Sequence, residues 1–325
     1  MERKGLRIRW DGGIFVNLED TKIFIDPIGV PREKPDIVIV SHAHRDHYSL
    51  KALRSMNAPI LMSEPTQKII YHDRRPESVL IVRDEFNIGD ISLKFIDSGH
   101  IIGSKGVLIE GGMKIFYTGD FTTEKRTILN PLKPVECDIL ITEATYGAEF
   151  YNFPEREELY DRLLELVEKA LRGSESVYIG ARTLGTAQEI FALFSREGLS
   201  DLVSLEPRIC RNTVIHAEYE EIGKVSENKE NIGIILSSIG RVVFRIRRGE
   251  KAIVCTGLSV RWRMPNTVPL SSHEDMEGLL DFVERTGAKK VYTIYGHHRK
   301  FAKILRRRGI EARSLEDSSL QPLPF

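Results

Sequence analysis

One feature restricts how this chain can fold more than any other: an apolar run that stops at a dense cluster of polar side chains. Residues 35–41 read Pro-Asp-Ile-Val-Ile-Val-Ser, and this β-branched run predicts a buried strand. Residues 42–47 follow at once as His-Ala-His-Arg-Asp-His. The cluster therefore begins where a strand ends, which is where the sites of α/β sheets form.

The spacing within residues 42–47 suits metal binding. His42 and His44 lie two positions apart, so in an extended segment both rings point to one side and reach one ion. Asp46 and His47 follow where the chain turns, and they are free to face a second ion. Zinc accepts imidazole and carboxylate ligands, and an open coordination position admits a water molecule whose pKa the metal lowers. The alternative is a solvated histidine cluster, which would explain a single histidine better than three.

Further candidates follow other apolar runs. His100 comes after residues 91–96, and Asp120 comes after residues 114–117. Three late histidines, His273, His297 and His298, leave only His72 and His216 of the nine histidines outside these segments. Several short segments of one kind, each ending in a ligand residue, favour a shared metal centre over scattered structural histidines.

Length and composition set the class of protein. A chain of 325 residues can bury one large core with a smaller inserted unit. Its 41% apolar content is ordinary for a soluble protein, and no apolar run is long enough to cross a bilayer. The first residues lack the apolar core of a secretory signal, so we expect a cytoplasmic protein with no membrane partner. The formal net charge is +0, so global charge neither favours nor excludes a polyanionic partner.

The cysteines and the local periodicity complete this picture. Cys137, Cys210 and Cys255 form no CxxC pair and are expected to be reduced thiols. Apolar patterns predict a strand-rich first layer, then helices and a strand, and a return to the first layer from residues 251–255 onward. The predicted strands are 13–18, 22–26, 37–40, 79–82, 91–96, 106–110, 114–117, 138–142, 176–179, 251–255 and 290–294, and the predicted helices are 155–171, 186–195, 276–285 and 298–308. Residues 201–250 give no clear pattern.

Taken together, these segments resemble the metallo-β-lactamase fold and, within it, the β-CASP nucleases that process DNA or RNA. Asp26 in Ile-Asp-Pro is similar to the first motif, in which the aspartate supports the ligand loop. The next three motifs match residues 42–47, His100 and Asp120. Glu143 is similar to the motif that separates β-CASP members from other hydrolases of this fold, and His273 is similar to the next motif, a histidine close to the scissile phosphate. Residues 177–189 resemble the start of the inserted domain.

The nearest subgroup by resemblance is the ligase-associated DNA exonucleases and their Artemis-like relatives. The matching segments are residues 25–27, 137–143 and 269–275. The resemblance implies an αββα sandwich with a smaller inserted β-CASP α/β domain. It divides the chain into residues 1–147 and 265–325 for the metallo-β-lactamase domain, with residues 148–264 inserted.

The resemblance also implies a reaction and its residues. We expect phosphodiester hydrolysis by a hydroxide that the metal generates, with single-stranded DNA or RNA as substrate of an exonuclease in repair or processing. The cofactors would be two divalent ions, Zn²⁺ or alternatively Mn²⁺. The implied metal ligands are His42, His44, Asp46, His47, His100, Asp120 and His297, and the implied catalytic residues are Asp46, Asp120, Glu143 and His273.

One position departs from the family pattern. Related enzymes carry histidine or valine before a late glycine, whereas this chain has Tyr295 before Gly296. Tyrosine is a poor zinc ligand, so either the second ion lacks this ligand or His297 supplies it. An exposed histidine at the start of the last helix is the alternative for His297.

Basic residues indicate where a polyanion would bind. Arg182 precedes a glycine turn and a helix start, where amide groups receive phosphate. Arg261 and Arg263 flank Trp262, which combines cations with an aromatic face for base stacking. Tight packing and a solvated edge are the structural alternatives for these residues.

Two rival functions are a small-molecule metallo-hydrolase of the same fold and a non-catalytic nucleic-acid-binding subunit. The first leaves Glu143, His273 and the inserted segment without a role, and the second is expected to lose ligands that this chain keeps. The sequence leaves open DNA against RNA, exonuclease against endonuclease, polarity, and the oligomeric state.

Overall fold

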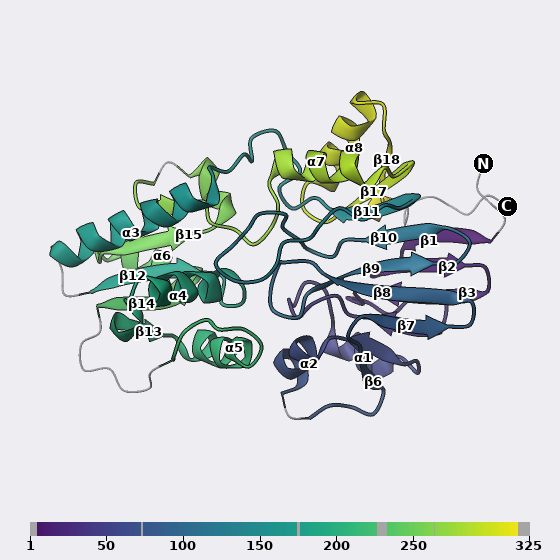
Figure 1. Cartoon of the computed structure of the whole chain (residues 1–325), viewed down its shortest axis with the longest axis horizontal. Coiled ribbons are helices and arrows are strands. Elements are labelled where there is room, and N and C mark those ends of the chain that lie inside the picture. The colour runs from purple at the N-terminus through teal and green to yellow at the C-terminus, as the bar shows by residue number, and fades with distance from the viewer. Residues whose placement is uncertain (1–4, 73, 174–175, 226–232, 263, 318–325) are drawn as a thin grey trace.

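The computed structural model describes residues 5–72, 74–173, 176–225, 233–262 and 264–317. Three sheets organise these residues, two in a sandwich and one in a separate α/β unit beside it (Figure 1). The sandwich is on the right of the view, and the α/β unit with α3 to α6 is on the left.

The first sheet is built from the N-terminal part of the chain. Antiparallel pairing joins the first three strands, and parallel pairing joins the rest. In spatial order its strands are β1 (Leu6–Trp10), β2 (Ile14–Leu18), β3 (Thr21–Ile25), β4 (Ile37–Ile39), β5 (Ile60–Met62) and β6 (Val79–Ile81).

The second sheet combines the middle of the chain with its late part. Strand β17 pairs in parallel with β11, so the chain does return to the sandwich. The return comes later than the sequence predicts, because residues 252–255 form a strand of the third sheet instead. In spatial order the strands are β18 (Glu311–Ser314), β17 (Lys290–Ile294), β11 (Ile139–Glu143), β10 (Lys114–Tyr117), β9 (Lys105–Glu110), β8 (Ile91–Asp97) and β7 (Glu85–Ile88).

Apolar side chains of the two sheets form the main core. Alternation in β8 turns Ile91, Leu93 and Phe95 inward, where they meet the buried residues of β2 and β3. Helices α1 (Leu50–Ser55) and α2 (Glu64–Tyr71) cover the outer face of the first sheet. Helices α7 (Met276–Thr286) and α8 (His298–Arg307) cover that of the second. The expected αββα sandwich is confirmed.

The third sheet is entirely parallel and has helices on both faces. Its order is β13 (Val203–Leu205), β14 (Ile234–Ser238), β12 (Val177–Ala181), β15 (Ala252–Cys255) and β16 (Thr267–Val268). Buried residues of α3 (Arg156–Arg172) and α4 (Thr186–Arg196) pack on one face. Helix α6 (Ile239–Arg247) packs on the other through Val242. This unit is the smaller α/β part that the sequence predicts.

The segment 201–250, which the sequence leaves unassigned, contains much of this unit. It holds β13, β14, α6 and helix α5 (Pro207–Ala217). The last strand of the third sheet, β16, lies beyond residue 264, the expected end of the inserted domain. The boundaries at residues 147 and 264 stay predictions.

Two further expectations concern cysteines and membranes. Cys137, Cys210 and Cys255 are free thiols, and burial raises the pKa of Cys137 to about 11. Among the described residues, every helix is too short or too polar to pass through a bilayer.

Candidate metal centre

The ends of strands from both sheets of the sandwich bring the predicted ligands together. Residues 42–47 follow β4, and His100 follows β8. Asp120 follows β10, Glu143 ends β11, and His273 lies in the loop before α7. All of these side chains except Asp46 and the intervening Arg45 are buried. Parallel and antiparallel strands of two layers thus present their polar ends at one edge of the sandwich.

Asp120 lies at the middle of this cluster. Its Oδ2 is 3.4 Å from His42 Nε2, 3.2 Å from His47 Nε2 and 3.5 Å from His100 Nε2. His44 Nδ1 lies 2.9 Å from His100 Nε2. The potential ligand atoms of His42, His44, His100 and Asp120 all fall within 4.8 Å of one another. Four such atoms at this separation can surround one ion, because zinc takes four ligands in structural sites and three with a water in catalytic ones.

The opposite ring nitrogen of each histidine is held by the protein. His42 Nδ1 is 2.9 Å from Ser41 Oγ, and His44 Nε2 is 3.1 Å from the Leu184 carbonyl. His100 Nδ1 is 2.9 Å from the Ser272 carbonyl. Such outer hydrogen bonds fix the tautomer and leave the other nitrogen free as a metal ligand.

Asp26 performs this outer role for His47. It accepts hydrogen bonds from His47 Nδ1 at 2.8 Å, from Ser41 N and Oγ at 2.7 Å each, and from Tyr117 Oη at 2.6 Å. Burial would raise the pKa of Asp26, but His47 and His42 outweigh it and lower this pKa. The anionic side chain therefore binds Ser41 and His47 at the two ends of the histidine-rich loop.

Orphaned polar atoms support a bound cation. His42 Nε2, His273 Nε2 and Asp120 Oδ1 are buried and have no hydrogen-bond partner among the described residues. A buried polar atom without a partner costs about 1–3 kcal/mol. Because these three atoms belong to residues of one buried cluster, a divalent cation would satisfy them, and the residues present fit such a group.

The protonation states also suit metal binding. Burial lowers the pKa values of His44 and His100 well below the usual range of histidine. The charge of Arg182 lowers the pKa of His44 further, and that of His273 lowers the pKa of His100 further. Neutral imidazole is the form that binds metals. Burial opposes the charge of Asp120 too, yet His47 and His273 hold its pKa well below the usual range. The cluster therefore combines neutral rings with an anionic carboxylate.

His273 and Glu143 form a pair at the rim of the cluster. His273 Nδ1 lies 2.9 Å from Glu143 Oε2, and His273 Nε2 lies 3.9 Å from Asp120 Oδ2. Phe121 N donates to Glu143 Oε1 at 2.9 Å, which fixes the carboxylate. Burial disfavours a charged ring, but Glu143 and Asp120 outweigh it and raise the pKa of His273. A basic, oriented imidazole thus faces the centre.

Asp46 lies near the cluster but turns outward. Its carboxylate pairs with Arg182 of β12's C-terminal end at 3.2 and 3.3 Å, and both side chains are exposed. Burial raises the pKa of Asp46, but Arg182 and His47 lower it below its usual value. Asp46 and Arg182 therefore connect the ligand loop to the third sheet.

A basic cavity of about 610 Å³ opens beside His44 and Asp46. It lies between the ligand loop and the third sheet's helices. Its arginines are Arg45, Arg182, Arg208, Arg211 and Arg241. Of these five arginines, the sequence indicates only Arg182 as a substrate contact. The three-residue spacing of Arg208 and Arg211 puts both on one face of α5, and that pattern could have shown them had the helix been recognised.

The two candidates for the late ligand take different places. The ring of Tyr295 packs on that of His47, with centroids 4.5 Å apart, and the φ of Tyr295 is +60°. His297 is not in the cluster: its ring lies 5.4 Å from Tyr151 and 5.7 Å from Phe150. The structure therefore brings Tyr295, rather than His297, next to the ligands.

Of the three predicted substrate contacts, Arg182 and Arg261 also lie in different places. Arg182 reaches the centre through Asp46, and Arg261 lies over the ring of Phe150, 4.8 Å from its centroid. Arg263 lies outside the described residues. Trp262 contributes to the apolar cluster around Val242.

A buried ion network behind the cluster was not foreseen. Arg126 donates to the His100 carbonyl at 3.0 Å and, through Nε, to Glu189 Oε2 at 3.0 Å. Glu189 also accepts from Tyr160 Oη at 2.6 Å. Arg156 donates to the Ser271 carbonyl at 2.8 Å. The network joins α3 and α4 to the loops of His100 and His273, and its residues are too far apart in sequence to form a recognisable motif.

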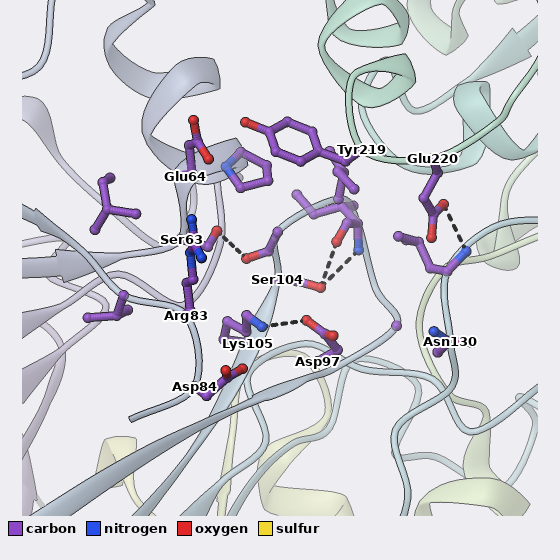
Figure 2. A pocket seen from close by; sticks show the side chains of 18 residues that line it. Ser63, Glu64, Arg83, Asp84, Asp97, Ser104, Lys105, Asn130, Tyr219 and Glu220 are labelled. Carbon is purple, nitrogen blue, oxygen red and sulfur yellow. Dashed lines mark hydrogen bonds and ion pairs between the residues drawn. The ribbon is translucent and has the colours of Figure 1, made fainter. Parts of the chain in front are cut away.

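A second cavity, of about 400 Å³, lies behind the His100 loop and contains none of the ligands (Figure 2). Asp97 and Lys105, opposite each other on β8 and β9, form an ion pair of 2.7 Å at one edge of it, and Tyr219 and Glu220 close it from the side of the third sheet. It is separate from the metal centre.

Comparisons with known proteins agree with this geometry. The family profile "Beta-lactamase superfamily domain" matches residues 7–152. A solved protein of unknown function from Enterococcus faecalis V583 has a similar fold, with a TM-score of 0.59 and 14% identity. That match covers 91% of this chain and 95% of the solved one.

Two curated relatives are similar in sequence. A "Probable DNA ligase" of Opitutus terrae is 27% identical, over 87% of this chain and 29% of its own length. An "RNase J-like protein" of Methanocaldococcus jannaschii is 30% identical, over 56% of this chain and 48% of its own length. The chain spans less than half the length of either relative.

Proposed function

Given that residues 7–152 form a domain of the β-lactamase superfamily, we propose that this chain is a metal-dependent nuclease of the β-CASP type. One observation carries the proposal: a buried cluster of histidines and Asp120 opens beside a cavity lined by five arginines. Five arginines against the two carboxylates of Asp46 and Glu206 give the cavity an excess of positive charge. Metal ligands beside such a cavity suit hydrolysis of a polyanion better than that of a small neutral molecule. The RNase J-like relative supports the same substrate class.

We assign two divalent ions to the centre, with Zn²⁺ favoured by its nitrogen-rich ligands and Mn²⁺ as the alternative. His42, His44, His100 and Asp120 would hold the first, and Asp46, His47 and Asp120 the second. Such ions supply Lewis acidity and a nucleophile at neutral pH. Tyr295 beside His47 and the position of His297 leave the second set one ligand short, so we expect it to bind more weakly.

The chain's own residues would perform the remaining steps. Asp46 is expected to turn inward to the second ion and to break its ion pair with Arg182. The guanidinium of Arg182 is then free to bind a substrate phosphate. His273, kept basic by Glu143, would donate a hydrogen bond to a phosphate oxygen or a proton to the leaving oxygen. The arginines of the cavity would hold neighbouring phosphates.

We propose single-stranded DNA or RNA as substrate, cleaved by an exonuclease in repair or processing in the cytoplasm. The similarity to both a "Probable DNA ligase" and an "RNase J-like protein" supports a nucleic acid and favours neither sugar. The third sheet would be the inserted domain that forms one wall of the substrate groove.

The test is cleavage of end-labelled single strands of DNA and RNA by purified protein with Zn²⁺ or Mn²⁺. Asp120→Asn removes a charge at the centre of both ligand sets, and we expect a loss of at least about 1000-fold in rate, comparable to removing a key charge-stabilising group. Asp281→Asn, which changes an exposed carboxylate on α7, is the matched control and should keep the wild-type rate. Wild-type protein that cleaves neither polymer, or a fully active Asp120→Asn variant, would refute the proposal.

A further inference from the structure

We propose that Phe150 is a stacking platform for one unpaired base of the substrate strand. This inference rests on the proposed nuclease function and names a subsite for it. Phe150 lies in the loop after β11, the strand that ends with Glu143 at the metal centre, and 41% of the residue is exposed. A large exposed aromatic ring beside a candidate site needs a physical reason, because burying it would stabilise the fold.

Aromatic contacts connect Phe150 to the metal centre. The ring of Phe150 lies 4.6 Å from that of Tyr151, and Tyr151 lies 4.7 Å from Tyr146. Tyr146 in turn lies 5.9 Å from the ring of His273. Tyr146 and Tyr151 are buried, so Phe150 is the exposed outer member of a packed row of rings. This row fixes Phe150 in place relative to His273.

Two cations accompany the exposed ring. The guanidinium carbon of Arg261 lies 4.8 Å from the ring centroid, and Lys300 Nζ lies 5.3 Å from it. Both side chains are exposed. Among the described residues neither forms an ion pair with a carboxylate. Their charges are therefore available to an anionic ligand.

This combination fits a nucleotide. Single-strand binding sites pair aromatic rings, on which bases stack, with cations that contact the backbone phosphates. Arg261 and Lys300 reach Phe150 from two different elements, the 3-10 turn Gly257–Arg261 and α8, so two separate segments bring positive charge to the ring. A base would stack on Phe150 while both cations move to the adjoining phosphates. A paired base is already stacked in its duplex, so the platform selects an unpaired one.

The test measures binding of fluorescent oligonucleotides by anisotropy, with Asp120→Asn as background to prevent cleavage. We expect Phe150→Ala to weaken binding of a single strand by about 5-fold to 150-fold, the range for losing one stacked base. Phe150→Trp keeps a ring and should retain the affinity. Binding of a duplex of the same length should be unchanged by Phe150→Ala.

Two controls make the result specific. Phe244→Ala removes another exposed phenylalanine, which lies under Arg248 on α6, and should leave single-strand binding unchanged. With Phe150 present, a single strand should bind more weakly when its one abasic nucleotide lies where a base would stack on Phe150. With Phe150→Ala, the affinity should no longer depend on the position of the abasic nucleotide. Equal binding of single strands by the Phe150 and Phe244 variants, or the same abasic profile in both, would overturn the platform. Failure of the nuclease proposal is seen separately, as absence of cleavage by the wild-type protein.

Discussion

Single residues of the centre are held by contacts that their neighbours in sequence do not supply. Asp26 lies 21 positions before His47, yet the two side chains meet because β3 and β4 pair in parallel and end together. Glu143 and His273 are 130 positions apart and meet at the rim. The sequence indicates which of these residues bear chemistry, since their types and positions after apolar runs are local properties. Their partners are set by the packing of strands.

Glu274, next to His273, gives a prediction at this scale. Burial raises its pKa to about 7, although Thr123 N donates to its carboxylate. A carboxyl whose pKa is higher in the folded state contributes its full stabilisation at pH values below its pKa in the unfolded chain, near 4.5. This stabilisation is lost as the pH rises through the folded-state pKa of about 7. The wild-type free energy of unfolding should therefore fall by about 1–3 kcal/mol between pH 5.5 and pH 8.5 relative to Glu274→Gln.

Urea unfolding at both pH values measures this difference. Glutamine keeps an oxygen that accepts from Thr123 N and does not titrate, so the variant isolates the carboxyl. A parallel pH dependence in the two proteins would rule out the assignment.

At the scale of elements, the helices of the third sheet are tied to the metal centre by buried charge. Arg126 donates hydrogen bonds to the His100 carbonyl and to Glu189 of α4. Arg156 of α3 donates to the Ser271 carbonyl. The sequence predicts both helices from their apolar periodicity, with ends within one residue of those observed. It does not predict the network, because an arginine has no local signal that distinguishes a buried ion pair from a solvated one.

Glu189→Gln tests the network. Burial raises the pKa of Glu189, but Arg126 and Arg156 more than compensate and lower it. Removing this charge leaves buried Arg126 without its carboxylate partner and buried Arg156 with Glu124 alone, so we expect a loss of about 3–5 kcal/mol in unfolding free energy. Glu197→Gln, at the exposed end of the same helix, breaks a pair with Arg196 and should cost less than about 1 kcal/mol. Similar losses in urea unfolding for both variants would contradict the role of the network.

For the whole molecule, the metal ions should stabilise the fold by joining its two sandwich layers. Ligands come from the ends of β4, β8 and β10, which belong to different sheets. An ion that binds only the folded chain adds about 2.7 kcal/mol at 100 times its Kd. We therefore expect Zn²⁺ to raise the Tm of chelator-treated protein by several degrees, with two ions bound per chain at saturation.

Calorimetry and elemental analysis after dialysis measure these quantities. His100→Ala removes a ligand of the first set and should abolish most of the increase in Tm. His72→Ala, which changes a histidine outside the cluster, should not. An equal increase in all three proteins would show that zinc binds elsewhere.

The sequence by itself determined the class of fold and the candidate ligands of the centre. Histidines and aspartates after β-branched runs mark these candidates at strand ends, because strand formation and ligand type depend on neighbouring residues. Tertiary structure alone decided which arginines line the cavity, why Tyr295 rather than His297 lies beside His47, and that two cations lie near the exposed ring of Phe150. These features depend on how the third sheet packs against the sandwich, and such contacts between distant segments leave no local pattern in the chain.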